Sequence, residues 1–520
     1  MTDFMPTSLT LNLKNQLSLE DLMAYATGRT ETVALSADPA FKSWIDQNHA
    51  FLQAKVEAGW PIYGASTGFG SSSASRMALS ETGDLQKNLF RYHGCGVGPS
   101  FQEAELAAIL LVRTNCLTQG CSGISFELME RLELLLQHRI LPLIPVRGSV
   151  GASGDLTPLS YIAAALAGEK EVLWQGQVMK SQEAWDKLGR KPYTFKSREA
   201  LSIMNGTSVM AAIAGLAWVR LERLYELTAL ATAAMVELWQ GPCAPFFPEL
   251  HAVKPHKGQG EAAAQILSYL FESRDRLQKR DPLTQKASLE GAVQDPYSIR
   301  CVPQILGAFK DALNVTRDWI ETEINSVNDN PVFLHEEELV LNGGHFLGQH
   351  MTLACDMLKA SAANLVNLLD RQMALLMESR SRLPENLVSP SVASNLHHGF
   401  KAMQITMSAI ASEMAKMAMP MSVFSRPTEA SNQDVVSMGT TAARDILQMS
   451  ELAMDAVSIH LMAIQQSFYI LGEQGALPRL NPSLEKAFQG IAEQFPMLKE
   501  DRALDTNIMS LRAHLFEGLA

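Results

Sequence analysis

One run of small residues, RGSVGASGDLTP from Arg147 to Pro158, has the residue types most suited to unusual backbone chemistry. Small residues permit a tight turn, a cradle for phosphate or a close approach of two backbones. The run lacks the lysine of a Walker A loop and the spacing of a dinucleotide-binding fingerprint. A helix should follow it, capped near Asp155 or Thr157. Considered without its context, the run is most often a plain turn.

The longer string GSVGASGDLTPLS closely resembles the cofactor-forming motif of the aromatic amino acid ammonia-lyases and aminomutases. The resemblance implies that Ala152-Ser153-Gly154 cyclises and loses water to give 4-methylidene-imidazol-5-one (MIO). The amide nitrogen of Gly154 would attack the carbonyl of Ala152, which needs a backbone free of bulky side chains. Ser153 would lose its hydroxyl, leaving a methylidene group. The product is an electrophile, which none of the twenty side chains provides.

Other motifs of that family occur in the same order along the chain. The segment YGASTGFG, from Tyr63 to Gly70, resembles the mobile loop whose tyrosine is the catalytic base. Asn205 resembles the asparagine that contacts the MIO ring, and QDPYSIRC contains Tyr297 and Arg300. Three more motifs follow in order: Asn328-Asp-Asn-Pro331, Gly343-Gly-His-Phe346 and Ser431-Asn-Gln-Asp434.

Each of these segments also has an ordinary structural interpretation. A lone YGASTGFG is more often a turn than a site, and Asn205 can simply cap the helix that follows it. An arginine after a QDPY turn is usually solvated or caps a helix. Phe346 can be a core aromatic residue, and Gln433 can stabilise a helix start. Their joint occurrence with the cyclising triad favours the functional interpretation.

The resemblance implies a mechanism without a metal or a diffusible cofactor. The substrate amine adds to the electrophile and becomes a better leaving group, and Tyr63 takes the β proton. A free tyrosine titrates near ~10, so we expect helix N-termini and donors around MIO to lower its pKa. Asn205 and Tyr297 would donate hydrogen bonds to the imidazolone oxygen. Arg300 would bind the substrate carboxylate in a two-pronged contact, and the glycine-rich loop would close over the substrate.

The substrate depends on the residues around the side-chain pocket, which we expect to include Gly70, Tyr92, His93, Phe346, Asn432 and Gln433. The family's selector pair is His-Leu in tyrosine lyases, Phe-Leu in phenylalanine lyases and Ser-His in histidine lyases. Tyr92-His93 matches none of these. His93 favours histidine, whereas Asn-Gln-Asp at 432–434 matches the tyrosine and phenylalanine enzymes and lacks the glutamate of the histidine lyases.

An apolar substrate ring would leave the polar atoms of Tyr92 and His93 unpaired, at about 1–3 kcal/mol for each group. A phenol can pair with both, so we expect L-tyrosine to be converted to trans-p-coumarate and ammonia. The alternatives are a histidine ammonia-lyase that forms urocanate, a phenylalanine ammonia-lyase and a 2,3-aminomutase. A non-enzymatic alternative is an inactive helical scaffold, against which the complete set of motif residues argues.

Helical periodicity dominates the sequence and predicts a mainly α fold. The resemblance implies a fumarase/aspartase-like helical architecture. The fumarase/aspartase group is itself the nearest rival class of enzyme, but its GSSxMPxKxN-like signature is absent. We expect a long central helical bundle and a smaller N-terminal domain that carries MIO, with residues 1–205 and 206–520 as the two domains. The pattern predicts helices at 103–116, 126–136, 207–238, 260–279, 304–327, 349–378, 399–417 and 439–470. Loops that collect binding groups are expected at 63–75, 94–100, 147–158, 291–301 and 341–348.

Composition limits the partners. The chain has 520 residues and a formal charge of −12, which disfavours binding to nucleic acid or to an anionic membrane. Six scattered cysteines without a CxxC pair indicate neither a zinc site nor a disulfide framework. No export signal or membrane-spanning run is visible, so we expect a cytoplasmic protein. Long helices that are apolar all round, together with the resemblance, imply a homotetramer with shared active sites.

Overall fold

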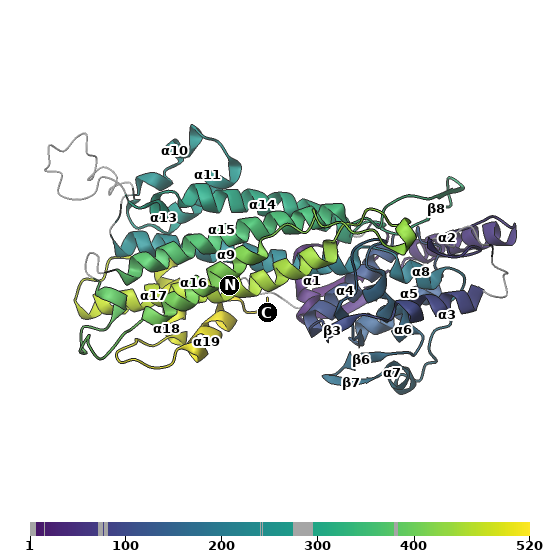
Figure 1. Cartoon of the computed structure of the whole chain (residues 1–520), viewed down its shortest axis with the longest axis horizontal. Helices are drawn as coiled ribbons and strands as arrows, with labels where there is room; N and C mark the ends of the chain where they lie inside the picture. Colours follow the sequence, from purple (N-terminus) through teal and green to yellow (C-terminus); the bar gives the residue numbers. More distant parts are fainter. Residues whose placement is uncertain are drawn as a thin grey trace. The chain divides into compact units, whose positions relative to one another are not determined.

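The structure is a computed structural model, and it describes residues 7–14, 16–70, 76, 82–239, 241, 243–273, 295–378 and 383–519 (Figure 1). The chain divides into two compact units. The first comprises Met1–Val219, Arg317–Asp356 and Pro420–Leu447, and the second Arg220–Thr316, Met357–Met419 and Gln448–Ala520. Because the first unit draws on three separate stretches of sequence, distant motifs can meet within it. The division near Asn205 expected from composition remains a prediction.

The first unit combines short helices with small sheets. Its helices are α1 (Leu19–Ala26), α2 (Pro39–Glu57), α3 (Thr82–His93), α4 (Glu103–Leu117), α5 (Phe126–Gln137), α6 (Leu156–Leu166), α7 (Ser181–Lys187) and α8 (Glu199–Met204). Its strands are β1 (Thr7–Leu11), β2 (Thr30–Leu35), β3 (Val97–Ser100), β4 (Leu141–Pro142), β5 (Pro145–Arg147), β6 (Glu171–Trp174), β7 (Gln177–Lys180), β8 (Val332–Leu334) and β9 (Leu339–Leu341). A short 3-10 helix, η5, spans Glu429–Ser431.

The strands pair mostly with near neighbours in the chain. β1 and β2 are parallel, whereas β3 pairs with β5, β4 with β6, β6 with β7 and β8 with β9 in antiparallel fashion. In Figure 1 the β6–β7 hairpin lies beside α7, which it contacts. Helices α3, α6 and α8 pack on one another. These three helices border the segments that carry the candidate chemistry.

Four long helices cross the division between the units: α9 (Ser208–Leu238), α14 (Val302–Ile324), α15 (Gln349–Met377) and α17 (Gly439–Glu473). The second unit adds η3 (Ala244–Phe246), α10 (Pro248–Ala252), α11 (Lys257–Tyr269), α13 (Tyr297–Arg300), η4 (Glu385–Leu387), α16 (Lys401–Met417), α18 (Pro482–Gln494) and α19 (Asp505–Leu515). Almost every side chain along α9 is buried, as expected for a helix that is apolar all round. No helix among the described residues has both the length and the hydropathy that a bilayer crossing demands.

The prediction of a mainly helical chain is confirmed, and most long helices lie within a few residues of their expected bounds. Three local expectations need correction. The loop expected at 94–100 contains strand β3, because its residues pair with β5, and the loop expected at 291–301 contains the short helix α13. The helix expected at 260–279 ends at Tyr269. Residues 71–75, 274–279 and 291–294, which include Gln294, lie outside the described residues.

Candidate active site

The cyclising triad lies in the connection between β5 and α6, where its backbone is pressed against a second segment. Gly154 has φ +64, and a Cβ built on it would lie 2.1 Å from the carbonyl oxygen of Gly206. The two glycines form a parallel bridge, and the amide of Asp155 donates to the Gly206 oxygen over 2.7 Å. Only glycine fits at position 154, so the tight backbone that cyclisation requires is present.

A buried carboxylate fixes the far end of the triad. Asp155 is fully buried and accepts hydrogen bonds from the Met210 amide at 2.9 Å, from the Ser149 hydroxyl at 3.0 Å and from Thr440. Burial raises the pKa of Asp155, while these donors oppose that rise. The Ser149 hydroxyl also accepts from the Gly151 amide at 3.1 Å. The segment is therefore held at both ends by hydrogen bonds.

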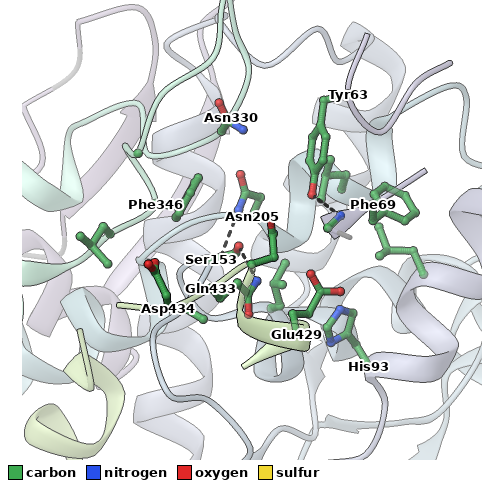
Figure 2. Close-up of a pocket in the computed structure, with 18 of the residues that line it drawn as sticks. Tyr63, Phe69, His93, Ser153, Asn205, Asn330, Phe346, Glu429, Gln433 and Asp434 are labelled. Atoms are coloured by element: carbon green, nitrogen blue, oxygen red, sulfur yellow. Dashed lines mark hydrogen bonds between the residues drawn. The ribbon is translucent and has the colours of Figure 1, made fainter. Parts of the chain in front are cut away.

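Two side-chain amides from distant parts of the sequence point at Ser153 (Figure 2). Asn205, at the C-terminal end of α8, donates from Nδ2 to the main-chain oxygen of Ser153 over 3.0 Å. Gln433 donates from Nε2 to the Ser153 hydroxyl over 3.1 Å. The other end of the Gln433 amide accepts a hydrogen bond of 2.7 Å from Thr428. Both amides are thus oriented toward the residue that the motif predicts to be modified.

A cavity of about 410 Å³ opens over Ser153. Its lining includes ten of the residues expected from the sequence: Tyr63, Gly70, Tyr92, His93, Ala152, Ser153, Asn205, Phe346, Asn432 and Gln433. Figure 2 shows Tyr63, Ser153, Asn205 and Phe346 around this space. The first unit therefore brings together residues that the sequence separates by hundreds of positions. Gly154 belongs to the same segment but does not line the cavity.

Tyr63 contributes its hydroxyl to one wall of the cavity. The hydroxyl accepts a hydrogen bond from the Gly70 amide over 3.0 Å, and the ring packs edge-on against Phe69. Burial is the largest effect on the pKa of Tyr63 and raises it; the hydrogen bond from the Gly70 amide lowers it, the Glu429 carboxylate raises it and Arg198 lowers it, in that order of size. A donor that lowers this pKa is therefore present at Gly70, as expected, but within the single chain desolvation of the phenolate outweighs it and the net pKa is raised.

Tyr92 and His93 stand at the C-terminal end of α3, with ring centroids 4.4 Å apart. Burial lowers the pKa of His93 to about 4. Tyr92 is 56% exposed in the single chain; its partial burial, followed by the charge of Glu429, raises its pKa to about 12. Both residues are therefore neutral near pH 7, and each can donate and accept one hydrogen bond.

Glu429, which no sequence motif indicated, lines the cavity on the same side as His93 (Figure 2). Its carboxylate lies against Gly70, where an added Cβ would be 1.7 Å from Oε2. Glu429, Ala430 and Ser431 have φ values of 52, 50 and 65, a left-handed run that non-glycine residues rarely adopt. Its position two residues before the expected Ser431–Asp434 motif was the only available signal in the sequence. Asn330, Phe69 and Asp434 also line the cavity.

Tyr297 and Arg300 belong to the second unit and are not among the residues that line the cavity. The side chain of Tyr297 is 70% exposed. The guanidinium of Arg300 lies 4.5 Å from the centre of the Tyr297 ring, and its Nε donates to the Asp295 oxygen over 3.0 Å. The structure thus keeps the predicted pair together in α13, and their contact with a substrate remains a prediction.

Comparison with known proteins agrees with this site. A family model described as aromatic amino acid lyase matches residues 17–493. A histidine ammonia-lyase from Alkaliphilus oremlandii (strain OhILAs) is 36% identical over 509 residues, which cover 97% of this chain and 96% of the relative. A tyrosine 2,3-aminomutase from Chondromyces crocatus is 36% identical over 511 residues, which cover 96% and 94% of the two chains.

A solved structure gives the same result for the fold. The X-ray structure of tyrosine aminomutase from Streptomyces globisporus matches with a TM-score of 0.89 at 30% identity, and the match covers 99% of this chain and 97% of the other. The chain therefore belongs to the aromatic amino acid lyase family, whose catalysis depends on MIO. It is a carbon–nitrogen lyase.

Proposed function

We propose that this chain forms MIO from Ala152-Ser153-Gly154 and uses it to eliminate ammonia from an aromatic L-amino acid, with L-tyrosine as the preferred substrate. The observation that carries this proposal is the packing of Gly154 against Gly206, where no Cβ can be accommodated, with an amide donor aimed at Ser153. A backbone compressed in this way suits a ring closure between neighbouring peptide units.

The proposed cyclisation forms one bond and releases two waters from the triad. A bond forms from the amide nitrogen of Gly154 to the carbonyl carbon of Ala152. The Ala152 oxygen leaves as water with the two amide hydrogens of Ser153 and Gly154. The Ser153 hydroxyl leaves as a second water with the hydrogen on Cα. The Ser153 carbonyl oxygen stays, and it is the atom that Asn205 contacts.

Gln433 and Asn205 have separate tasks in this scheme. Gln433 donates to the hydroxyl that must leave, which stabilises the charge that develops on its oxygen. Asn205 donates to the oxygen that remains in the ring, where negative charge accumulates during turnover. Once formed, MIO supplies an electrophile that turns the substrate amine into a better leaving group.

The remaining steps fall to side chains of the protein. Tyr63 removes the proton from Cβ of the substrate. Tyr92 and His93 form hydrogen bonds with the phenol of the tyrosine substrate. Arg300 binds the carboxylate. The surroundings of Tyr63 within its own unit raise its pKa, so we expect a positive charge or a donor from another subunit to lower it in the assembled enzyme.

We therefore propose a homotetramer in which the Tyr63 loop and the Arg300 segment of one active site come from different subunits. The rim of the cavity supports this, because Val435 lines it and is 61% exposed in the single chain. Co-expression of Tyr63→Phe with Arg300→Ala tests the arrangement. Each variant alone should be inactive, and mixed tetramers should regain measurable turnover. Mixed tetramers without turnover, or a fully active monomer by light scattering, would contradict it.

L-histidine is the second candidate substrate. The Glu429 carboxylate near His93 can accept a hydrogen bond from an imidazole ring, and a relative with 36% identity is named a histidine ammonia-lyase. A panel of tyrosine, histidine and phenylalanine, followed by the ultraviolet absorbance of the unsaturated acid, tests the function. Detection of a β-amino acid in the same reactions would identify a 2,3-aminomutase instead. No product from any of the three would contradict the proposed function.

A further inference from the structure

A buried glutamine outside the cavity joins three of the elements that border it. Gln86 lies on α3, is 0% exposed and is not among the residues that line the cavity. Its Nε2 donates to the main-chain oxygen of Gly64 over 3.0 Å. Its Oε1 accepts from the amides of Ala200 and Leu201 over 3.1 and 3.3 Å. One side chain from α3 thus connects the Tyr63 loop with the first turn of α8.

Helix α8 needs this acceptor. The first amides of a helix have no partner within it and are usually satisfied by the side chain of the N-cap residue. Here the N-cap residue is Arg198, with φ 68, and its side chain makes no capping hydrogen bond. Gln86 supplies the missing acceptor from another helix. Because α8 is only six residues long and Asn205 is its C-cap residue, fixing its first turn also restrains the position of Asn205.

The Tyr63 loop meets α8 at the same place. Gly64 has φ +70, and a Cβ built on it would lie 2.4 Å from Cδ2 of Leu201. Gly64 therefore lies directly against Leu201 while Gln86 bridges the backbones of both residues. This contact is one residue from Tyr63 in the chain and four residues from Asn205. A small displacement at Gln86 would reach both groups.

We propose that Gln86 is a positioning residue that sets the Tyr63 hydroxyl relative to Asn205 and to the substrate. The proposal rests on the proposed function, because it assigns Tyr63 and Asn205 the roles given there. Gln86 touches neither substrate nor Ser153. It acts through the backbone of Gly64 on one side and through the start of α8 on the other.

The expected loss of rate in a Gln86 variant follows from the precise geometry that catalysis requires. A displacement of a reacting group by about 1 Å can cost about 10²-fold in rate, even when the substitution is remote from the chemistry. Gln86→Met keeps the length and nearly the volume of the side chain but removes both hydrogen-bonding groups. We expect Gln86→Met to lower kcat about 10²-fold with a smaller change in KM, because binding of the substrate ring by Tyr92 and His93 does not use Gln86.

Gln466 offers a matched control in the second unit. It is also 0% exposed, donates to the Leu498 oxygen at 2.9 Å and accepts from the Leu498 amide at 2.9 Å. Gln466→Met removes a comparable set of buried hydrogen bonds far in sequence from the candidate active-site motifs. We expect it to lower the melting temperature about as much as Gln86→Met does while leaving kcat within about twofold of the wild type.

A double-mutant cycle separates positioning from a general structural effect. If Gln86 positions Tyr63 as well as Asn205, Gln86→Met should lower kcat by a smaller factor in the Tyr63→Phe background than in the wild type, because one of the two groups that it positions is already lost. The proposal would be overturned if the kcat losses of Gln86→Met and Tyr63→Phe add fully in the double variant. It would also be overturned if Gln86→Met and Gln466→Met lose kcat equally. If Gln86→Met does not fold, Gln86→Glu keeps the acceptor for the Ala200 and Leu201 amides; at about pH 9, above the raised pKa of a buried carboxyl, it replaces the donor to Gly64 by a carboxylate oxygen that repels the Gly64 carbonyl. It should show the same coupling to Tyr63→Phe.

The mass of the peptide that contains residues 152–154 distinguishes failure of this proposal from failure of the proposed function. Gln86→Met should retain the loss of two waters, since Gln86 makes no contact with the triad. If Gln86→Met shows the two-water loss and a normal kcat, only the role of Gln86 is refuted, and the proposed function stands. An intact triad in the active wild type refutes the proposed function itself.

Discussion

The side-chain amide of Asn205 donates a hydrogen bond of 3.0 Å to the main-chain oxygen of Ser153. Asn205 is 4% exposed and is the C-cap residue of a helix of six residues. The contact exists in the uncyclised chain and is directed at the oxygen that would remain in the ring. If the triad cyclises as proposed, this donor would already be in place for the modified residue.

Asn205→Ala should lower kcat by about 10²–10³-fold, the usual cost of removing one donor to an oxygen that gains charge. The rate should be expressed per modified triad, as measured by peptide mass, so that slower ring formation is not mistaken for slower turnover. A variant with wild-type kcat per modified triad would show that this hydrogen bond has no part in turnover.

Tyr63→Phe should fold and keep the modified triad but lose about 10²–10⁴-fold in kcat, because it removes the proton acceptor with almost no change in volume. The loss should lie at the severe end, since the proton comes from carbon. Turnover is measured by the ultraviolet absorbance of the unsaturated acid that forms. Near-normal turnover would transfer the role of base to another group.

The sequence predicted the long helices well because an uninterrupted 3.6-residue pattern over more than twenty positions has few other interpretations. The expected and observed bounds of α9, α15 and α17 differ by at most a few residues. Strand β3 could not be predicted, because its residues become a strand only by pairing with β5, about fifty positions away. Local patterns carry no information about such a partner.

Site residues could be predicted where they belong to a contiguous sequence motif. They could not be predicted where only their position in the folded chain makes them important. Ser153 and Asn205 were identified from their motifs, and the structure brings them within hydrogen-bonding distance. Glu429 and Gln86 were missed. Glu429 enters the cavity through a left-handed turn, and Gln86 matters through hydrogen bonds to two segments distant in sequence. Neither property is visible in a linear pattern.

Tyrosine should be deaminated with a higher kcat/KM than phenylalanine or histidine, because Tyr92 and His93 present two neutral polar groups near pH 7. A site that hydrogen-bonds a hydroxyl can reject the analogue without it by up to ~10⁴–10⁵. His93→Leu should weaken tyrosine use and narrow the gap to phenylalanine, whereas Gln433→Glu should shift preference toward histidine. Faster formation of urocanate than of coumarate by the wild type would reverse this ranking.

Acid should destabilise the protein partly through His460. Burial lowers its pKa to about 3 from 6.5. The unfolded chain therefore takes up a proton as the pH falls below 6.5 while the folded chain does not, so stability is lost between pH 6.5 and about 3. His460→Gln keeps a partner for Gln372, which lies 3.0 Å from Nε2. Its melting temperature should fall less between pH 7.5 and 5 than that of the wild type. If the melting temperatures of the two proteins fall equally with pH, His460 does not cause the loss of stability in acid.

The mass of the proteolytic peptide that contains Ala152-Ser153-Gly154 shows directly whether this triad forms MIO. We expect a peptide lighter than the encoded sequence by two waters. We also expect Ser153→Ala to retain the fold, to lose nearly all turnover and to lack that two-water deficit. An unmodified triad in a preparation that turns over an aromatic amino acid would rule out MIO formation as the basis of catalysis.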